Sequence, residues 1–164
     1  MSASPVPPLL VFGWGNPSRG DDALGPQCIA QLRQHFAHEA RIEFLEDFQL
    51  QVEHALDLLG RTQVLLVDAS ASGTAPFATS AVHAAQDASY TSHALSPQAL
   101  LQAYAQVSTR PLPACTLLAI RGTDFALGAS LSTSAHSHLQ AATRWARQWL
   151  EHQLSALPTP ACSL

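Results

Sequence analysis

One run of apolar residues constrains the fold more than any other feature of the sequence. Val64-Leu-Leu-Val-Asp68 is apolar at every position before its final carboxylate. Strands of a parallel sheet have such runs, because helices cover both faces of the sheet. Other short apolar runs alternate with stretches whose apolar residues recur every three or four positions, which is the helical spacing. We therefore predict an α/β protein, a three-layer α/β/α sandwich around a five-stranded, mostly parallel (mixed) sheet.

The predicted elements alternate along the chain, and the start of one helix is marked clearly. Ser96 is a favourable N-cap residue, and Pro97 fits the first helical turn. The expected strands are 9–13, 41–47, 64–68, 78–85 and 115–120, and the expected helices are 24–36, 52–59, 97–107 and 134–154.

The length of 164 residues predicts a single domain over 1–164. We expect its core to span about 9–155, with a proline-rich lead-in at 1–8 and a tail at 155–164. The N-terminal segment lacks the charged region of a signal peptide, and no apolar run is long enough to cross a membrane. The expected location is the cytoplasm, without a membrane partner.

Charge composition excludes several classes of function. All eight basic side chains are arginines, and twelve carboxylates give a formal net charge of −4. The absence of lysine removes Schiff-base and P-loop chemistry. The arginines are scattered singly, so nucleic-acid binding is not expected, because it depends on clustered cations. The three cysteines are widely spaced, which argues against a disulfide framework and a cysteine-based zinc site.

The loop after the first predicted strand carries the strongest chemical signal. Its sequence, Gly13-Trp-Gly-Asn-Pro-Ser-Arg-Gly-Asp-Asp22, fails as a dinucleotide fingerprint because Ser18 stands where the third glycine is needed. Asp21 and Asp22 would repel a phosphate and suit a cation. Capping of the following helix is the alternative interpretation of either aspartate.

Two later residues can meet this loop if the first and third strands are neighbours. Asp68 follows the apolar run directly, although an Asx-turn would also place an aspartate there. His93 lies just before the helix that starts at Ser96, where a surface role is the alternative. Two carboxylates and one imidazole suit a divalent cation such as Mg, Mn, Fe, Ni or Zn.

These residues carry a family resemblance that covers roughly 9–155. Residues 11–25 resemble the opening motif of the [NiFe]-hydrogenase maturation endopeptidases, a strand followed by Gly-x-Gly-Asn, then Asp-Asp or Asp-Glu, then a glycine. Asp68 and His93 follow in the family's order and at similar distances. Residues 46–57, Glu-Asp-Phe-Gln-Leu-Gln-Val-Glu-His-Ala-Leu-Asp, resemble the subgroup that serves cytoplasmic, NAD-linked bidirectional hydrogenases, where many relatives have an Asp-Gly-Gly-Thr turn.

The resemblance implies an enzyme that removes a short C-terminal extension from the nickel-loaded precursor of the hydrogenase large subunit. It implies that nickel arrives with the substrate, that no organic cofactor is needed, and that the partner is this precursor; a monomer is expected. By position, the metal ligands are Asp22, Asp68 and His93, the catalytic candidates are Asp22, Asp68 and Asp47, and the residues of the substrate loop are Gly13, Gly15, Asn16 and Asp21. A non-proteolytic module that senses nickel or binds the precursor is the alternative, and a nucleotide-binding enzyme is a more distant one.

Overall fold

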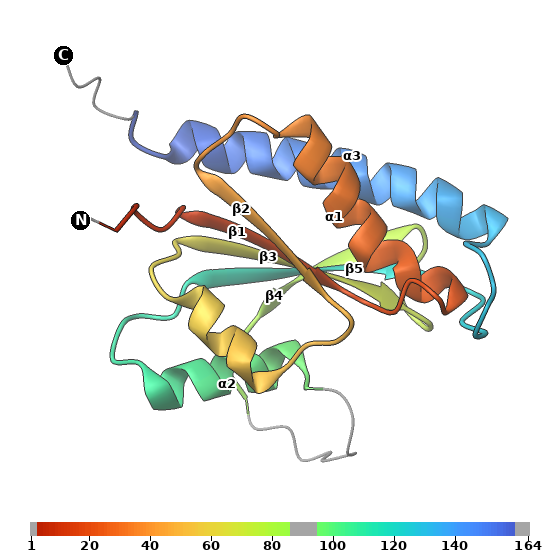
Figure 1. Ribbon diagram of the computed structural model, residues 1–164, viewed down its shortest axis with the longest axis horizontal. Coiled ribbons are helices and arrows are strands. Elements are labelled where there is room, and N and C mark those ends of the chain that lie inside the picture. Colours follow the sequence, from red (N-terminus) through yellow and green to blue (C-terminus); the bar gives the residue numbers. More distant parts are fainter. Residues whose placement is uncertain (1–2, 86–94, 160–164) are drawn as a thin grey trace.

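The computed structural model describes residues 3–85 and 95–159, and these form a sheet with helices on both faces (Figure 1). The predicted α/β architecture is confirmed, with β4 as the antiparallel strand of a five-stranded sheet in the order β2-β1-β3-β5-β4. The elements are β1 (Leu9–Trp14), η1 (Gly20–Ala23), α1 (Leu24–His35), β2 (Ile42–Asp47), η2 (Val52–Leu58), β3 (Gln63–Ser70), β4 (Phe77–Val82), α2 (Pro97–Val107), β5 (Ala114–Arg121) and α3 (Thr133–Ala156).

Most predicted elements occur close to the expected positions, with two differences. The expected short helix at 52–59 is a 3₁₀ helix, η2, and the expected strand at 78–85 is β4, which begins and ends earlier. Ser96 caps α2 as predicted, since its hydroxyl accepts a hydrogen bond from the Ala99 N–H at 3.1 Å. Ser132 caps α3 in the same way, accepting from the Ala135 N–H at 3.2 Å.

Two hydrophobic clusters lie on opposite faces of the sheet. Helices α1 and α3 cover one face, and η2 and α2 cover the other (Figure 1). Alternate residues of β3 supply the two clusters, since Leu65 and Val67 face α1 and α3 whereas Val64 and Leu66 face η2 and α2. All four side chains are fully buried, which explains why the strand has no polar residue between Gln63 and Asp68.

The strand order places the ends of β1 and β3 at a point where the chain reverses direction across the sheet. From β1 the chain passes to β2 on one side and then returns to β3 on the other side. Sites in open α/β sheets form at such switch points, beyond the carboxyl ends of the strands. Within the described residues, no helix is long and apolar enough to cross a membrane.

The first turn of α1 lies against the ends of both strands. A Cβ on Gly25 would overlap the carbonyl oxygen of Trp14 in β1 and lie 3.1 Å from the carbonyl oxygen of Val67 in β3. Gly13 has a related role, because a Cβ there would lie 2.5 Å from Cγ1 of Ile29. Small residues therefore allow α1 to begin directly beside the switch point.

Gly25→Ala tests this close packing, because the packing determines whether the substitution raises or lowers the free energy of unfolding. An alanine in a helix normally stabilises a protein by roughly 0.5–1 kcal/mol relative to glycine. Here the overlap with backbone atoms reverses the sign, and we expect a loss of about 1–3 kcal/mol in the free energy of unfolding. Urea denaturation measures the change, with Gln31→Ala on the exposed side of α1 as the near-neutral control. A stabilised Gly25→Ala variant would contradict the packing described here.

Candidate functional site

Three strand ends bring chemically active side chains to one edge of the sheet. Trp14 ends β1, Asp47 ends the neighbouring β2 in register with it, and Asp68 lies near the end of β3. Trp14 belongs to the cluster on the η2 and α2 face. Asp68 follows Leu66 by two positions and therefore faces the same side. The first and third strands are neighbours, which is the condition for Asp68 to lie near the loop after β1.

The loop between β1 and α1 folds around Asp22. One carboxylate oxygen of Asp22, Oδ2, accepts a hydrogen bond from the Asn16 N–H at 2.6 Å, and the Asn16 side chain accepts one from the Ser18 N–H at 2.9 Å. Gly15 has φ 151°, and a Cβ at this position would overlap the carbonyl oxygen of Asp22. Neither η1 nor α1 has a side-chain cap, so Asp22 closes its own loop instead of capping a helix.

Asp22 and Asp68 are close enough to repel one another. Burial raises the pKa of Asp68 to about 7, and the negative charge of Asp22 raises it as well. Hydrogen bonds from the Ala69 N–H and the Trp14 side chain oppose these effects but do not outweigh them. Asp68 is therefore half protonated near neutral pH, and it is poised to exchange that proton or to accept a cation in its place.

Asp21 faces away from this pair and is fully buried. Its Oδ1 accepts a hydrogen bond from the Ser132 N–H at 2.7 Å, and its Oδ2 accepts from the Ser132 hydroxyl and the Thr123 N–H, each at 2.7 Å. The Asp124 N–H donates a further bond at 3.1 Å. Burial alone would raise the pKa of Asp21, but these bonds lower it to about 2. Its side chain thus fixes the substrate loop predicted from the sequence to the β5–α3 connection.

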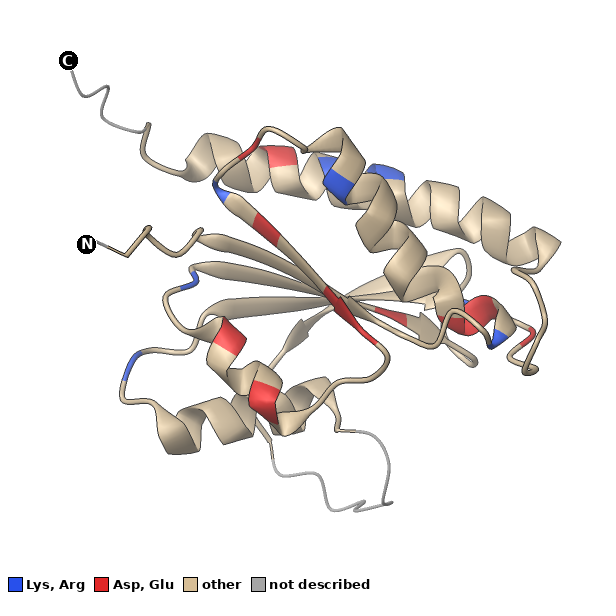
Figure 2. Cartoon of the chain, in the orientation of Figure 1, with Lys and Arg blue, Asp and Glu red and all other residues tan. Residues whose placement is uncertain are grey.

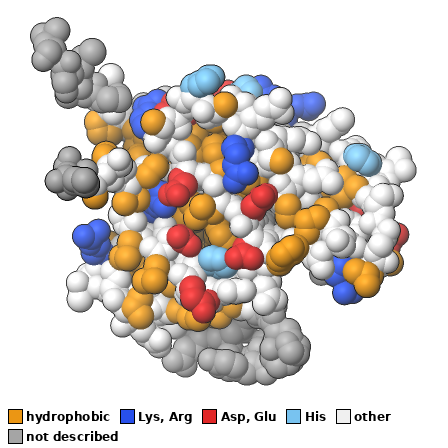
Figure 3. Space-filling model, viewed as in Figure 1, with side chains coloured by type: hydrophobic (Ala, Val, Ile, Leu, Met, Phe, Trp, Pro, Cys, Tyr) orange, Lys and Arg blue, Asp and Glu red, His pale blue; other side chains and the backbone are white. Residues whose placement is uncertain are grey.

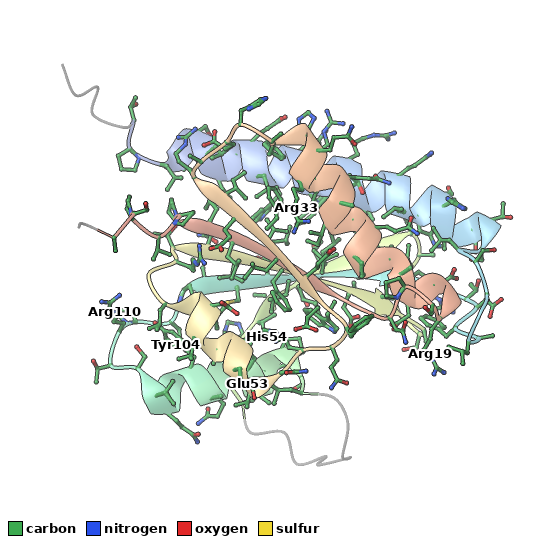
Figure 4. The ribbon with its side chains drawn as sticks, viewed as in Figure 1. Arg19, Arg33, Glu53, His54, Tyr104 and Arg110 are labelled. Carbon is green, nitrogen blue, oxygen red and sulfur yellow. The ribbon has the colours of Figure 1, made fainter. Side chains whose placement is uncertain are left out.

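Asp47 is paired with His54, a residue to which the sequence patterns did not point. The His54 Nε2 lies 3.1 Å from Asp47 Oδ2, and its Nδ1 accepts a hydrogen bond from the Gln51 N–H at 2.8 Å. The ring also packs on Phe12, with centroids 4.6 Å apart. Figure 4 shows His54 on the sheet side of η2. The capping-box spacing from Gln51 to His54 is the signal that could have indicated it.

The buried cysteines are unsuited to nucleophilic chemistry. Burial raises the pKa of both Cys28 and Cys115 to about 12, so each remains a thiol at neutral pH. Both side chains pack within the two hydrophobic clusters instead. The carboxylates at the sheet edge are therefore the better candidates for chemistry.

The third predicted metal ligand, His93, lies outside the described residues. Within residues 3–85 and 95–159, no group of three or more His, Cys, Asp or Glu side chains could hold a metal ion. The described part of the site therefore supplies two carboxylates. Two carboxylate groups can complete the coordination of a cation that is held mainly by another molecule.

Solved structures of known function share this architecture. The hydrogenase maturating endopeptidase HybD from E. coli superimposes with a TM-score of 0.69 at 20% identity, covering 88% of this chain and 93% of that one. The [NiFe]-hydrogenase maturation protease HycI from Thermococcus kodakarensis KOD1 gives 0.70 at 15% identity, with the same coverage. A hydrogenase 2 maturation peptidase from a Thaumarchaeota archaeon gives 0.63 at 21% identity, covering 87% and 97% of the two chains.

The chain has the fold of the hydrogenase maturation proteases. At these identities the likeness concerns the fold, and it does not resolve the subgroup suggested by residues 46–57. No protein-family model matches the chain, and no curated protein matches it either.

Asp68→Asn tests how much the buried negative charge of Asp68 lowers the free energy of unfolding. The wild-type carboxyl is neutral in the folded and unfolded chain below about pH 4. As pH rises toward 7, the unfolded chain releases the proton but the folded chain retains it, so wild-type stability falls and then stays low. We expect the variant to match wild type near pH 4 and to be more stable at pH 8 by roughly 2–4 kcal/mol. Denaturant unfolding at both pH values measures this difference, and equal stability at pH 8 would contradict a raised pKa.

Asp21→Asn should have the opposite effect, because its lowered pKa stabilises the fold. The contribution is present above about pH 4 and is lost as pH falls toward 2. We expect the variant to lose about 2 kcal/mol at pH 7 and to approach wild type near pH 2. Thermal unfolding across this range measures it, with Glu46→Gln at an exposed position as the control. A pH-independent difference would show that the ionised carboxylate is not responsible.

Proposed function

We propose that this protein is an endopeptidase that removes a short C-terminal extension from the nickel-loaded precursor of a [NiFe]-hydrogenase large subunit. The observation that carries the proposal is the pair of mutually repelling carboxylates, Asp22 and Asp68, at the switch point of the sheet. The fold shared with hydrogenase maturation proteases and the motif at residues 11–25 support it.

In this proposal the nickel belongs to the substrate and the site recognises it. Asp22 and Asp68 provide two oxygen donors, and the motif order assigns His93 as the third ligand. Burial and the charge of Asp22 both raise the pKa of Asp68, so an approaching cation would offset the buried negative charge and its repulsion by Asp22. A precursor without nickel would leave this repulsion in place, so recognition would depend on nickel insertion.

Hydrolysis requires a base for water and a proton for the leaving amine. Asp68 fits the first need where it does not itself bind the nickel, because a carboxyl group with a pKa of about 7 exchanges protons readily at neutral pH. Water adds to the scissile carbonyl carbon as Asp68 accepts its proton. The C–N bond then breaks, and the proton passes to the departing nitrogen. Asp22 and Asp47 are the other carboxylates that could accept the proton from water. The pairing with His54 orients Asp47.

The remaining properties follow from the same proposal. The enzyme needs no organic cofactor, acts in the cytoplasm as a monomer, and has the precursor as its partner, without nucleic acid or membrane. Residues 46–57 support a precursor from an NAD-linked bidirectional hydrogenase. Gly13, Gly15 and Asn16 shape the loop that presents Asp22 to the substrate.

Incubation with a purified large-subunit precursor, followed by mass spectrometry of the intact product, tests the function. We expect loss of a short C-terminal peptide only from the nickel-loaded precursor. Asp22→Ala should reduce the rate of cleavage at least 100-fold, because only one carboxylate of the pair would remain. Loss of a general acid–base group alone lowers a rate by about 10²–10⁴-fold.

The control variant is Glu151→Gln, which changes an exposed carboxylate on α3, away from the pair. Binding without cleavage by the wild-type protein would support the non-proteolytic module instead. Cleavage that depends neither on nickel nor on Asp22 would contradict the assigned site.

A further inference from the structure

The segment that follows the site has an unusual charge distribution. Residues 43–57 carry five of the twelve acidic side chains, and residues 42–60 contain no Arg or Lys. Glu43 forms an ion pair with Arg61, and Asp47 is paired with His54. Glu53 and Asp57 have no ion-pair partner among the residues that the structure describes. Figure 2 shows these acidic positions along β2 and η2.

Large apolar side chains are exposed in the same segment. Phe48 is 68% exposed, Val52 is 56% exposed and Leu56 is 61% exposed. Exposed apolar residues are common singly, but a group of them bordered by charge is typical of an interaction site. Phe48, Val52, Glu53, Leu56 and Asp57 together are called the η2 face below. Figure 3 shows acidic and apolar side chains side by side over β2 and η2.

Firm packing beneath the η2 face holds these side chains in place. Leu50, Ala55 and Leu58 are buried in the cluster under η2. The capping box between Gln51 and His54 fixes the start of η2. The apolar side chains are therefore exposed on a well-anchored element, so binding a partner would cost little ordering of this segment.

The η2 face is continuous with the candidate site. Phe48 follows Asp47 directly, and its N–H donates a hydrogen bond to Asp47 Oδ1 at 2.7 Å. Asp47 in turn is aligned with Trp14 at the end of β1, the strand that pairs with β3, which carries Asp68. A molecule whose reacting end lies at Asp22 and Asp68 can therefore extend across Asp47 onto Phe48 and η2.

Charge decides which kind of partner fits. Acidic and apolar side chains together complement a protein surface that combines apolar residues with Arg or Lys. A second copy of this chain is a poor match, because it has a net charge of −4 and no lysine. Anionic lipids and nucleic acids would be repelled by Glu53 and Asp57.

We propose that the η2 face docks the body of the large-subunit precursor, through a basic and apolar surface of that protein, while the C-terminal segment of the precursor enters the site. This inference rests on the proposed function and assigns it a substrate-docking surface. The acidic residues steer the encounter, and Phe48, Val52 and Leu56 hold the complex once it has formed.

Two double variants separate these contributions. Glu53→Lys with Asp57→Lys should lower the association rate constant for the nickel-loaded precursor about tenfold at low salt, with a smaller difference at high salt. Phe48→Ser with Leu56→Ser should raise the dissociation rate about tenfold. Both should raise KM for cleavage about tenfold and leave kcat within about twofold, because neither changes the carboxylate pair.

Matched substitutions elsewhere provide the controls. Val107→Ser changes a side chain that is 67% exposed on α2, and Glu151→Lys reverses a charge on α3, beyond the opposite face of the sheet. Surface plasmon resonance with immobilised nickel-loaded precursor gives the rate constants, and thermal unfolding confirms that each variant is folded. Sedimentation velocity of the free protein reports its own association.

The outcomes distinguish this inference from the proposed function. Selective loss of binding in the two η2-face variants supports it. If the two η2-face variants cleave the precursor with the KM and rate of the wild-type protein, the docking surface is overturned, but the endopeptidase proposal stands. A wild-type dimer that dissociates in Phe48→Ser with Leu56→Ser overturns it in favour of a second copy. If the wild-type protein neither binds nor cleaves the precursor, the proposed function fails and this inference fails with it.

Discussion

The buried carboxylate of Asp21 is the interaction on which the geometry of the candidate site depends. It joins the loop after β1 to the start of α3 through bonds from Ser132, Thr123 and Asp124. Gly122 leaves room for it, since a Cβ there would lie 2.7 Å from the Asp21 Cβ. With Asp21 fixed inward, the direction of the neighbouring Asp22 is restricted to the edge where β1 and β3 end. The hydrogen bonds that hold Asp21 thus determine where Asp22 lies.

Asp21 and Asp68 show how environment separates two residues of the same type. Both carboxyls lose water on folding, which raises the pKa of each. Four peptide and hydroxyl donors from the β5–α3 region outweigh this effect at Asp21. Asp68 has fewer donors and faces the charge of Asp22, so its pKa remains near 7. A protein tolerates such a destabilised carboxyl where chemistry or binding needs it.

The architecture could be predicted from the sequence because the local patterns are strong. The uninterrupted apolar run at 64–67 indicated a central strand, and Ser96 with Pro97 indicated a helix start. The partnership of Asp21 with Ser132 could not be predicted, because the two residues are 111 positions apart and only the fold brings them together. The placement of Trp14 beside the strand of Asp68 likewise depends on β1 and β3 being neighbours. The pairing of His54 with Asp47 spans only seven residues, but it depends on the turn between β2 and η2, which no apolar pattern reports. Periodicity identifies buried faces, but it does not identify the partners of polar groups.

Under the proposed function, a site with few ligands needs additional contacts to select its substrate. Two carboxylates, even with a third ligand, bind a divalent cation weakly when water and other proteins compete for it. Selectivity for one protein must then come from an extended surface, where apolar contacts and charge complementarity add to the contribution of the metal. Asp47 is suited to connect the two regions, because one oxygen is bonded to His54 and the other to the Phe48 N–H. Its hydrogen bonds anchor the start of the η2 face beside the carboxylate pair, so docking and chemistry would share one rigid strand end.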